Sequence, residues 1–141
     1  MSKDLENIVS FLDEHHVLSL ATRDDEEISV CSLFYVYEKV SKSFIVASGD
    51  DTLHIQHIKQ KSSVAGNIVL ETKTVGKIQG LQFRGEFLLL EDKELSKHYY
   101  KAFPYAKLMN PKLWQIKVNY FKMTDNRLGF GKKIIYSDFS F

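Results

Sequence analysis

The chain has 141 residues, 44% of them apolar, and this length and composition are typical of one compact domain rather than a disordered or fibrous chain. Lys and Arg total 19 against 18 Asp and Glu, so the net charge of +1 argues against a dedicated nucleic-acid binder, whose affinity depends on neutralising many phosphates. The sequence is therefore interpreted as a single domain over residues 1–141 that binds no nucleic acid.

Cysteine usage and the character of the N-terminus indicate where the protein works. Cys31 is the only cysteine, so no intramolecular disulfide can form, whereas small secreted domains are more often cross-linked. The first six residues include Asp4 and Glu6 where a signal peptide needs a basic start, and no stretch approaches the length of an apolar membrane span. We expect a cytoplasmic protein that does not cross a membrane.

The first elements in chain order are a helix and a hairpin. Apolar side chains recur at helical spacing over residues 5–12, and Ser2 can cap the first free amides, so this segment predicts an amphipathic helix. Residues 16–22 and 28–37 are rich in β-branched and aromatic side chains and flank an acidic loop. They are predicted to form a β-hairpin.

The middle of the chain alternates between strand and helix signals. Residues 43–47 predict a third strand, and a polar turn over 48–52 leads into a helix over 53–61. Residues 62–70 predict the next strand, in which Gly66 marks a bulge or a close approach of another segment.

The last third contains the clearest strand pattern. Apolar and polar side chains alternate over 81–89, which predicts a strand with one buried face. A helix is predicted over 91–103, because its apolar residues share one side and Pro104 ends it.

The remaining residues predict two further strands and, with them, the fold class. Residues 114–120 alternate, the apolar phase slips after Tyr120, and a turn over 124–131 leads into a strand over 132–136, so a bulge or bend is expected near Tyr120. Six or seven mostly antiparallel strands with about three helices favour a mainly β, α+β fold centred on a barrel over a doubly wound sheet.

The turn 48–52 is the best candidate for an anion site. It combines the hydroxyls of Ser48 and Thr52, a glycine and the free amides of a helix start, which together can hold a phosphate. Asp50 and Asp51 bring two negative charges, so an ordinary helix cap is the alternative interpretation. A second anion-binding candidate is the segment 129–133, which the alternative interpretation treats as a turn and a solvated basic strand.

Histidine and cysteine side chains indicate no metal site. His54 and His57 share a helix face, but no third ligand is evident, so they are interpreted as surface or phosphate-facing residues. Of the neighbouring His15 and His16, one is expected to be buried and hydrogen-bonded. Cys31 lies in an apolar strand without a basic neighbour, which is typical of a buried structural thiol.

Three segments carry a resemblance to a known family: residues 80–86 (GLQFRGE), Phe103–Pro104 and residues 124–133 (TDNRLGFGKK). With them, nearly the whole chain resembles the FMN-binding split-barrel superfamily typified by pyridoxamine 5'-phosphate oxidase, and more closely its bacterial YhbP-type branch. The resemblance implies a six- to seven-stranded antiparallel split β-barrel with peripheral helices. It also implies a homodimer with FMN in grooves between the subunits, and Tyr35 and Tyr37 are expected at edges that need covering.

The resemblance places the FMN phosphate near the turn after the third strand. The superfamily pattern there is a hydroxyl, three residues, a hydroxyl and two basic positions. Ser48 and Thr52 match the hydroxyls, whereas Leu53 and His54 stand at the basic positions. The oxidases also carry a basic residue near the position of Ser32. The resemblance also places the segments of Ser32, Phe34 and Gln79 along the isoalloxazine groove, so these residues are expected to bind the cofactor. Our own hypothesis adds Lys132 as compensating positive charge.

The function implied is that of an FMN-binding oxidoreductase acting on an unidentified small molecule. The flavin carries the redox chemistry, so no catalytic side chain is assigned. Oxidation of pyridoxamine phosphate itself is not expected, because no second set of basic residues for this substrate is found. Two alternatives stay open: a haem-binding split barrel with one histidine as axial ligand, and a non-enzymatic dimeric binding module that has lost its flavin.

Overall fold

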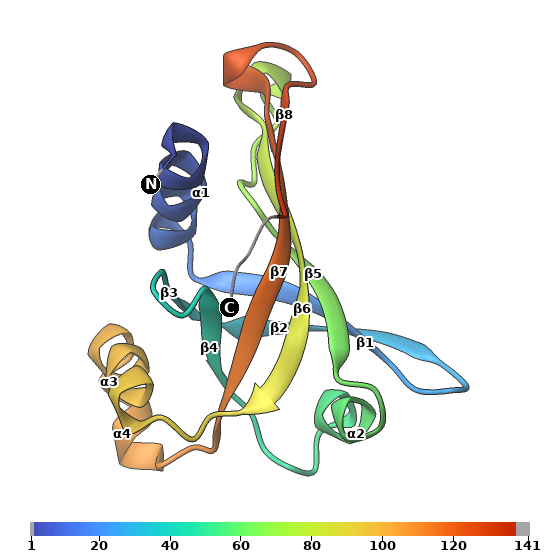
Figure 1. The fold of residues 1–141 in the computed structure, drawn as a ribbon, viewed down its shortest axis with the longest axis vertical. Helices are drawn as coiled ribbons and strands as arrows, with labels where there is room; N and C mark the ends of the chain where they lie inside the picture. Colours follow the sequence, from blue (N-terminus) through green and yellow to red (C-terminus); the bar gives the residue numbers. More distant parts are fainter. Residues whose placement is uncertain (1, 138–141) are drawn as a thin grey trace.

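One curled antiparallel sheet forms the body of the protein in the computed structural model, which describes residues 2–137 (Figure 1). Its eight strands confirm the mainly β, α+β fold expected from the sequence. The strands in chain order are β1 (Val17–Arg23), β2 (Ile28–Phe34), β3 (Val36–Glu38), β4 (Ser43–Ala47), β5 (Ser63–Val69), β6 (Gln79–Leu89), β7 (Leu113–Asp125) and β8 (Lys133–Tyr136). Their order across the sheet is β2-β1-β5-β6-β7-β4-β3, and β8 pairs with β7 beyond the end of β4.

Four α-helices and two short 3-10 turns lie around this sheet. The helices are α1 (Lys3–Glu14), α2 (Leu53–Gln60), α3 (Lys93–Ala102) and α4 (Ala106–Met109), and the turns are η1 (Val75–Lys77) and η2 (Asn126–Leu128). Helices α1, α3 and α4 lie on the side of β3 and β4, whereas α2 lies below β1 and β5 (Figure 1). Side chains cap the predicted helix starts, because Ser2 accepts from the Leu5 amide and Thr52 from the Ile55 amide. Among residues 2–137, no helix is both long and apolar enough to cross a bilayer.

The prediction of one strand over 28–37 is wrong at Tyr35, where the chain breaks into β2 and β3. The Tyr35 amide donates to the carbonyl of His16 at 2.9 Å, and its hydroxyl donates to the carbonyl of Leu12 at 2.8 Å. These bonds turn Tyr35 into the interior, and Tyr37 is buried as well. Both tyrosines therefore belong to the core. The sequence-based expectation that they lie at edges in need of covering is wrong.

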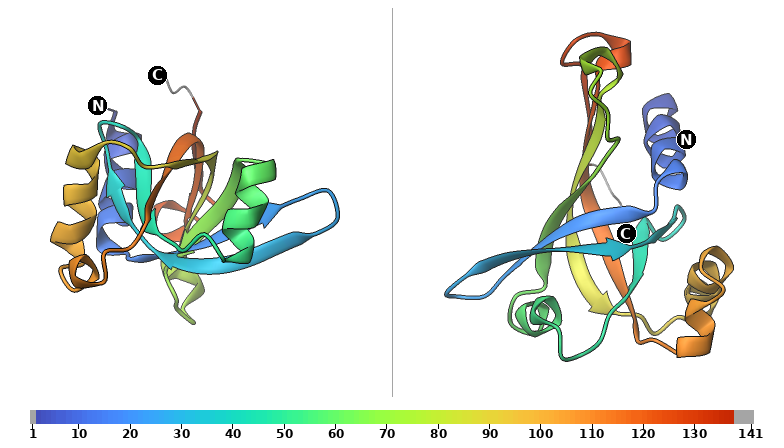
Figure 2. Two further views of the ribbon diagram at one scale, coloured as in Figure 1. Left: turned by 90° about the horizontal axis from the view of Figure 1, so that it is seen from below. Right: turned by 180° about the vertical axis from the view of Figure 1, so that it is seen from behind.

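The sheet curls around an interior, as two further views of the ribbon show (Figure 2). Aromatic side chains of the core cluster fill this interior. Phe44 lies at the centre, with its ring 4.6 Å from that of Phe83 and 5.1 Å from that of Tyr35. Gly66 of β5 is the predicted point of close approach, because an added Cβ would lie 2.3 Å from the Ser19 carbonyl oxygen. The ring of Phe83 and the backbone of Ser19 therefore leave no space for a side chain at position 66.

The two longest strands, β6 and β7, connect the two ends of the molecule. Arg84 faces Tyr120 but Gly85 faces Val118, so Asn119 stands outside the register and the predicted bulge occurs one residue before Tyr120. At its start β7 pairs with β4, and at its end it forms the hairpin with β8 at the top of Figure 1, opposite α2 at the bottom. The thirteen residues of β7 span roughly 40 Å.

Candidate functional site

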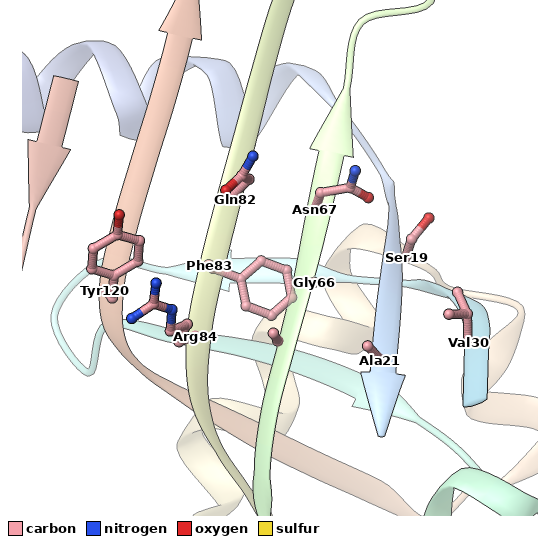
Figure 3. A pocket seen from close by; sticks show the side chains of 10 residues that line it. Ser19, Ala21, Val30, Gly66, Asn67, Gln82, Phe83, Arg84 and Tyr120 are labelled. Atoms are coloured by element: carbon pink, nitrogen blue, oxygen red, sulfur yellow. The ribbon is translucent and has the colours of Figure 1, made fainter. Parts of the chain in front are cut away.

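Two adjoining cavities form one groove, here called the outer groove, on the face of the sheet that points away from the core. Their volumes are about 530 and 330 Å³, within the range of small-molecule sites, and they share Ala21, Ala65 and Arg84. The larger cavity is lined by Ser19, Ala21, Val30, Ala65, Gly66, Asn67, Gln82, Phe83, Arg84 and Tyr120 (Figure 3).

Strand register explains why polar side chains line one edge of the outer groove. Ser19 faces Asn67, and Asn67 faces Gln82, so β1, β5 and β6 place these side chains in one row. Ser32 extends the row on β2, because it faces Ser19. Directly opposed residues of an antiparallel sheet point to the same face, and the amides of Asn67 and Gln82 offer both donors and acceptors along it (Figure 3).

The floor of the outer groove is flat and apolar. The neighbouring row consists of Val30, Ala21 and Ala65, which are small or β-branched. Gly66 adds no side chain to the floor, and the buried ring of Phe83 packs beneath it on the core side, where a Cβ would lie 2.4 Å from that ring. A planar ligand can lie on this row of small side chains, which ends at Arg84 on β6.

Charge at the groove is held by specific contacts. The guanidinium carbon of Arg84 lies 4.2 Å from the centre of the Tyr120 ring, a cation–π contact that fixes its position. In the smaller cavity, the carboxylate of Glu86 accepts hydrogen bonds from the hydroxyls of Ser62 at 2.6 Å and Ser63 at 2.7 Å. Arg84 is therefore the positive group that the larger cavity presents among the described residues.

Large apolar side chains surround the outer groove on the same face. They are between 45% and 78% exposed, although they are residues that are usually buried. The set is Val17, Ile28, Val30, Phe34 and Val69. An apolar face of this kind is typical of an interaction surface.

The predicted anion site is an ordered turn between β4 and α2, here called the Ser48 turn. Ser48 Oγ and His54 Nε2 are hydrogen-bonded at 2.5 Å, and Ser48 Oγ lies 3.4 Å from Thr52 Oγ1. The indole N–H of Trp114 donates to the Ser48 carbonyl at 2.9 Å and ties the turn to β7. Burial lowers the pKa of His54. The turn therefore offers hydroxyls and a mainly neutral imidazole near neutral pH.

Two lysines that the sequence did not indicate supply positive charge at the Ser48 turn. Lys112 donates to both carboxylate oxygens of Asp50, at 2.9 and 3.0 Å, and Lys59 lies 3.5 Å from the same carboxylate. Lys112 reaches the turn because its carbonyl accepts a hydrogen bond from the Ser48 amide. No local sequence signal links Lys112 to the Ser48 turn. The pairing of β4 with β7 brings them together.

The remaining predicted site residues are spread over the chain. Leu53 is the first residue of α2 and adds no charge. Phe34 packs on Phe103, with 5.6 Å between the ring centres. Gln79 is buried on the opposite face of β6 from Gln82, beside a small cavity that includes residues of α1. Lys132 precedes β8 and bonds to Asp125 at the end of β7, whereas the Ser48 turn bonds to Lys112 just before its start, so the two lie at opposite ends of β7.

Histidine and cysteine environments differ from the expectations. His57 is not at the surface: it is 1% exposed and hydrogen-bonded to Thr22. Neither His15 nor His16 is buried, although His15 bonds to the Phe11 carbonyl, because both lie between α1 and β1. Cys31 is only half-buried, and burial raises the pKa of its thiol.

The curled antiparallel sheet and its strand order place the protein in the class of split barrels. It is similar to a haem-binding protein from Mycobacterium smegmatis, with a TM-score of 0.78 over 97% of this chain and 59% of that one. It is also similar to an FAD-binding protein from Mesorhizobium loti (TM-score 0.72, 87% and 92%) and to the haem storage protein HutZ from Vibrio cholerae (0.64, 80% and 88%). Each is 15% identical, so these likenesses show the fold alone.

Sequence relatives identify the family. The chain is 35% identical to the UPF0306 protein of Cronobacter sakazakii over 135 residues, 94% of each chain. It is 33% identical to the UPF0306 protein YhbP of Escherichia coli over 132 residues, 92% of this chain and 90% of that one. The protein therefore belongs to the UPF0306 (YhbP) family, as the YhbP-type resemblance predicted. No protein-family model matches the sequence.

Proposed function

We propose that this protein is a flavoprotein that binds FMN in the outer groove and acts as an oxidoreductase on a small molecule. The observation that carries the proposal is the polar row of Ser19, Asn67 and Gln82 beside the flat floor of Ala21, Ala65 and Gly66. An isoalloxazine ring is planar and has one polar edge that both donates and accepts hydrogen bonds. The row and the floor match these two properties.

The residues of the groove fit the ring without supplying its chemistry. Bound flavin supplies hydride and single-electron transfer. Asn67 and Gln82 would orient the polar edge of the ring, and Arg84, held against Tyr120, would lend positive charge to the groove. No acidic or basic catalytic group is required of the chain, so the substrate is defined by what reaches the exposed face of the ring.

The Ser48 turn is the proposed phosphate site. Ser48 and Thr52 present hydroxyls at the N-terminus of α2, and Lys112 and Lys59 lie against Asp50 beside it. These two lysines can take the place of the basic pair that the superfamily pattern has at Leu53 and His54. The phosphate would compete with Asp50 for them.

A second copy of the chain is the proposed cover for the outer face. The exposed apolar side chains around the groove, such as Ile28 and Val30, lose their contact with water if two copies pair through this face. Pairing would also enclose the groove, which excludes water from a bound ring. The Gly-Phe-Gly-Lys-Lys segment can then approach a Ser48 turn only from the partner, because within one chain the segment and the turn lie at opposite ends of β7.

Titration of the cofactor-stripped protein with FMN tests the proposal. Saturable binding of one FMN per chain is expected, and the quenching of flavin fluorescence measures it. Asn67→Leu and Gln82→Leu, which keep the size but remove the amide, should each weaken binding by about tenfold or more. Gln56→Leu on the exposed side of α2 is the matched control and should change nothing. Absence of saturable binding would contradict the proposal.

Haem is the second candidate, supported by the two similar split barrels that are named for haem. Against it, no histidine lines either cavity of the outer groove in the described part of the chain. Haemin is therefore titrated in parallel, with its visible absorption as the readout. Stoichiometric haemin binding without flavin binding would favour the haem alternative, and binding of neither ligand would favour a module without a cofactor.

A further inference from the structure

A buried histidine and two carboxylates meet where α2 packs against the β1–β2 hairpin. His57 Nε2 lies 3.4 Å from Glu27 Oε1 and 3.7 Å from Asp24 Oδ2. The candidate donor atoms of the three residues all lie within 4.8 Å of one another. None of the three lines the outer groove or belongs to the Ser48 turn. This group is called the His57 cluster below.

The imidazole of His57 is fixed in the orientation that a metal ligand needs. Its side chain is 2% exposed, and its Nδ1 is hydrogen-bonded at 2.9 Å to the hydroxyl of Thr22, which is itself buried. A histidine that binds a metal through one ring nitrogen commonly donates its other N–H to an oxygen acceptor, which sets both the tautomer and the ring plane. Thr22 can be that acceptor, so the Nε2 lone pair is left facing Asp24 and Glu27.

The loop of the hairpin also fixes one carboxylate. Asp24 Oδ1 accepts hydrogen bonds from the amides of Glu26 and Glu27, both at 2.8 Å. These bonds leave the other oxygen, Oδ2, directed toward His57. The same two bonds lower the pKa of the Asp24 carboxyl.

The spacing of the donor atoms matches coordination better than direct hydrogen bonding. Two ligands at about 2.0–2.2 Å from a tetrahedral zinc ion are roughly 3.3–3.6 Å apart. The separations of 3.4 and 3.7 Å are close to this value, whereas N–H···O hydrogen bonds cluster near 2.9–3.0 Å. The cluster therefore has the size of a coordination sphere around a small cation.

We propose that Asp24, Glu27 and His57 bind one divalent cation of the zinc class, through one nitrogen and two carboxylate oxygens. This mixed donor set suits Zn²⁺, Co²⁺ or Mn²⁺, and a further coordination position remains for water. The bound ion joins the tip of the hairpin to α2. The sequence indicated no such site, because two ligands come from the acidic loop and lie about thirty residues before His57.

The test uses the full chain, stripped of metal, titrated with Zn²⁺ by calorimetry. One ion per chain is expected to bind. Asp24→Asn and Glu27→Gln should each weaken binding by about tenfold or more, since each removes one charged ligand. Asn at position 24 keeps the oxygen that caps the loop. The matched controls are Asp25→Asn and Glu26→Gln, which remove the same charge from the same loop and should alter affinity less than about twofold.

Co²⁺ binding gives a second readout, because its visible spectrum reports the ligand set. The spectrum should change in His57→Gln and stay unchanged in His16→Gln, which removes an exposed imidazole. If His57→Gln does not fold, the loop variants still decide the matter. The proposal is overturned if Zn²⁺ does not saturate the protein, or if the control variants lose as much affinity as Asp24→Asn and Glu27→Gln.

Discussion

Lys112 donates to both carboxylate oxygens of Asp50. This ion pair engages the lysine that is best placed to bind an anion at the Ser48 turn. Lys59 contacts the same carboxylate at 3.5 Å. The hydrogen bond from Lys112 is the main cause that lowers the pKa of Asp50, which keeps the aspartate charged at all physiological pH values. Asp50 therefore acts as an internal competitor for any phosphate.

Asp50→Asn should strengthen the binding of FMN by about two- to fivefold and leave riboflavin unchanged, because only FMN carries the phosphate that can use the freed lysines. Fluorescence titrations with both flavins measure the difference. Asp51→Asn, an exposed change of the same charge one residue later, is the control for general electrostatics. Equal effects on the two flavins would mean that the phosphate does not lie at this turn.

Gly66→Ala should lower the free energy of unfolding by about 1–3 kcal/mol or more. The added methyl would lie 2.3 Å from the Ser19 carbonyl oxygen, and neither that backbone nor the ring of Phe83 can withdraw without disturbing the β1–β5 pairing. Urea denaturation measures the loss. Gly80→Ala, on the neighbouring strand with nothing within 4 Å of the new methyl, should be close to neutral. Similar losses in both variants would contradict the close approach.

Acidification should destabilise the protein before its carboxylates titrate, in part through His54. Burial lowers the pKa of His54 below its ordinary value of 6.5. Between these two pKa values the unfolded chain binds a proton that the folded chain does not, so stability falls as the pH drops below about 6.5. His54→Asn should flatten this part of the profile of unfolding free energy against pH. An unchanged profile in His54→Asn would contradict the burial of this imidazole.

Val30→Lys should dissociate the proposed homodimer, because it places a charge at the centre of the apolar outer face. We expect the dimer dissociation constant to rise by at least about tenfold. Light scattering coupled to size-exclusion chromatography measures the mass over a range of concentrations. The control is Val40→Lys, a change of the same kind at a site that is 84% exposed and lies in the turn before β4. A monomeric wild-type protein would refute the proposal.

Periodicity predicted most of the fold because most strands bury one face. The alternation over β6 and the phase slip in β7 are properties of the local sequence, and both are present in the structure. The break at Tyr35 was not predictable in this way. It depends on hydrogen bonds to Leu12 and His16, which only the tertiary fold brings near.

The candidate sites show the same limit. Ser48, Thr52 and His54 are six residues apart at most, so a sequence pattern can indicate their turn. Asn67 and Gln82 become neighbours only through the register of β5 and β6. A one-residue slip of either strand in that register would send its amide to the core face, so no motif could have assigned both residues to the groove.

The pairing of β4 with β7 determines when the Ser48 turn can exist during folding. Ser43 lies opposite Lys117, more than seventy residues later, and the Ser48 amide donates to the carbonyl of the equally distant Lys112. Contacts so distant in sequence form late, because the intervening chain must be ordered first. On the ribosome, β1 and β2 can pair long before β7 has been synthesised. The Ser48 turn, which is the proposed phosphate site, is therefore expected to be among the last parts of the molecule to be completed, and a cofactor that binds there would meet an already folded chain.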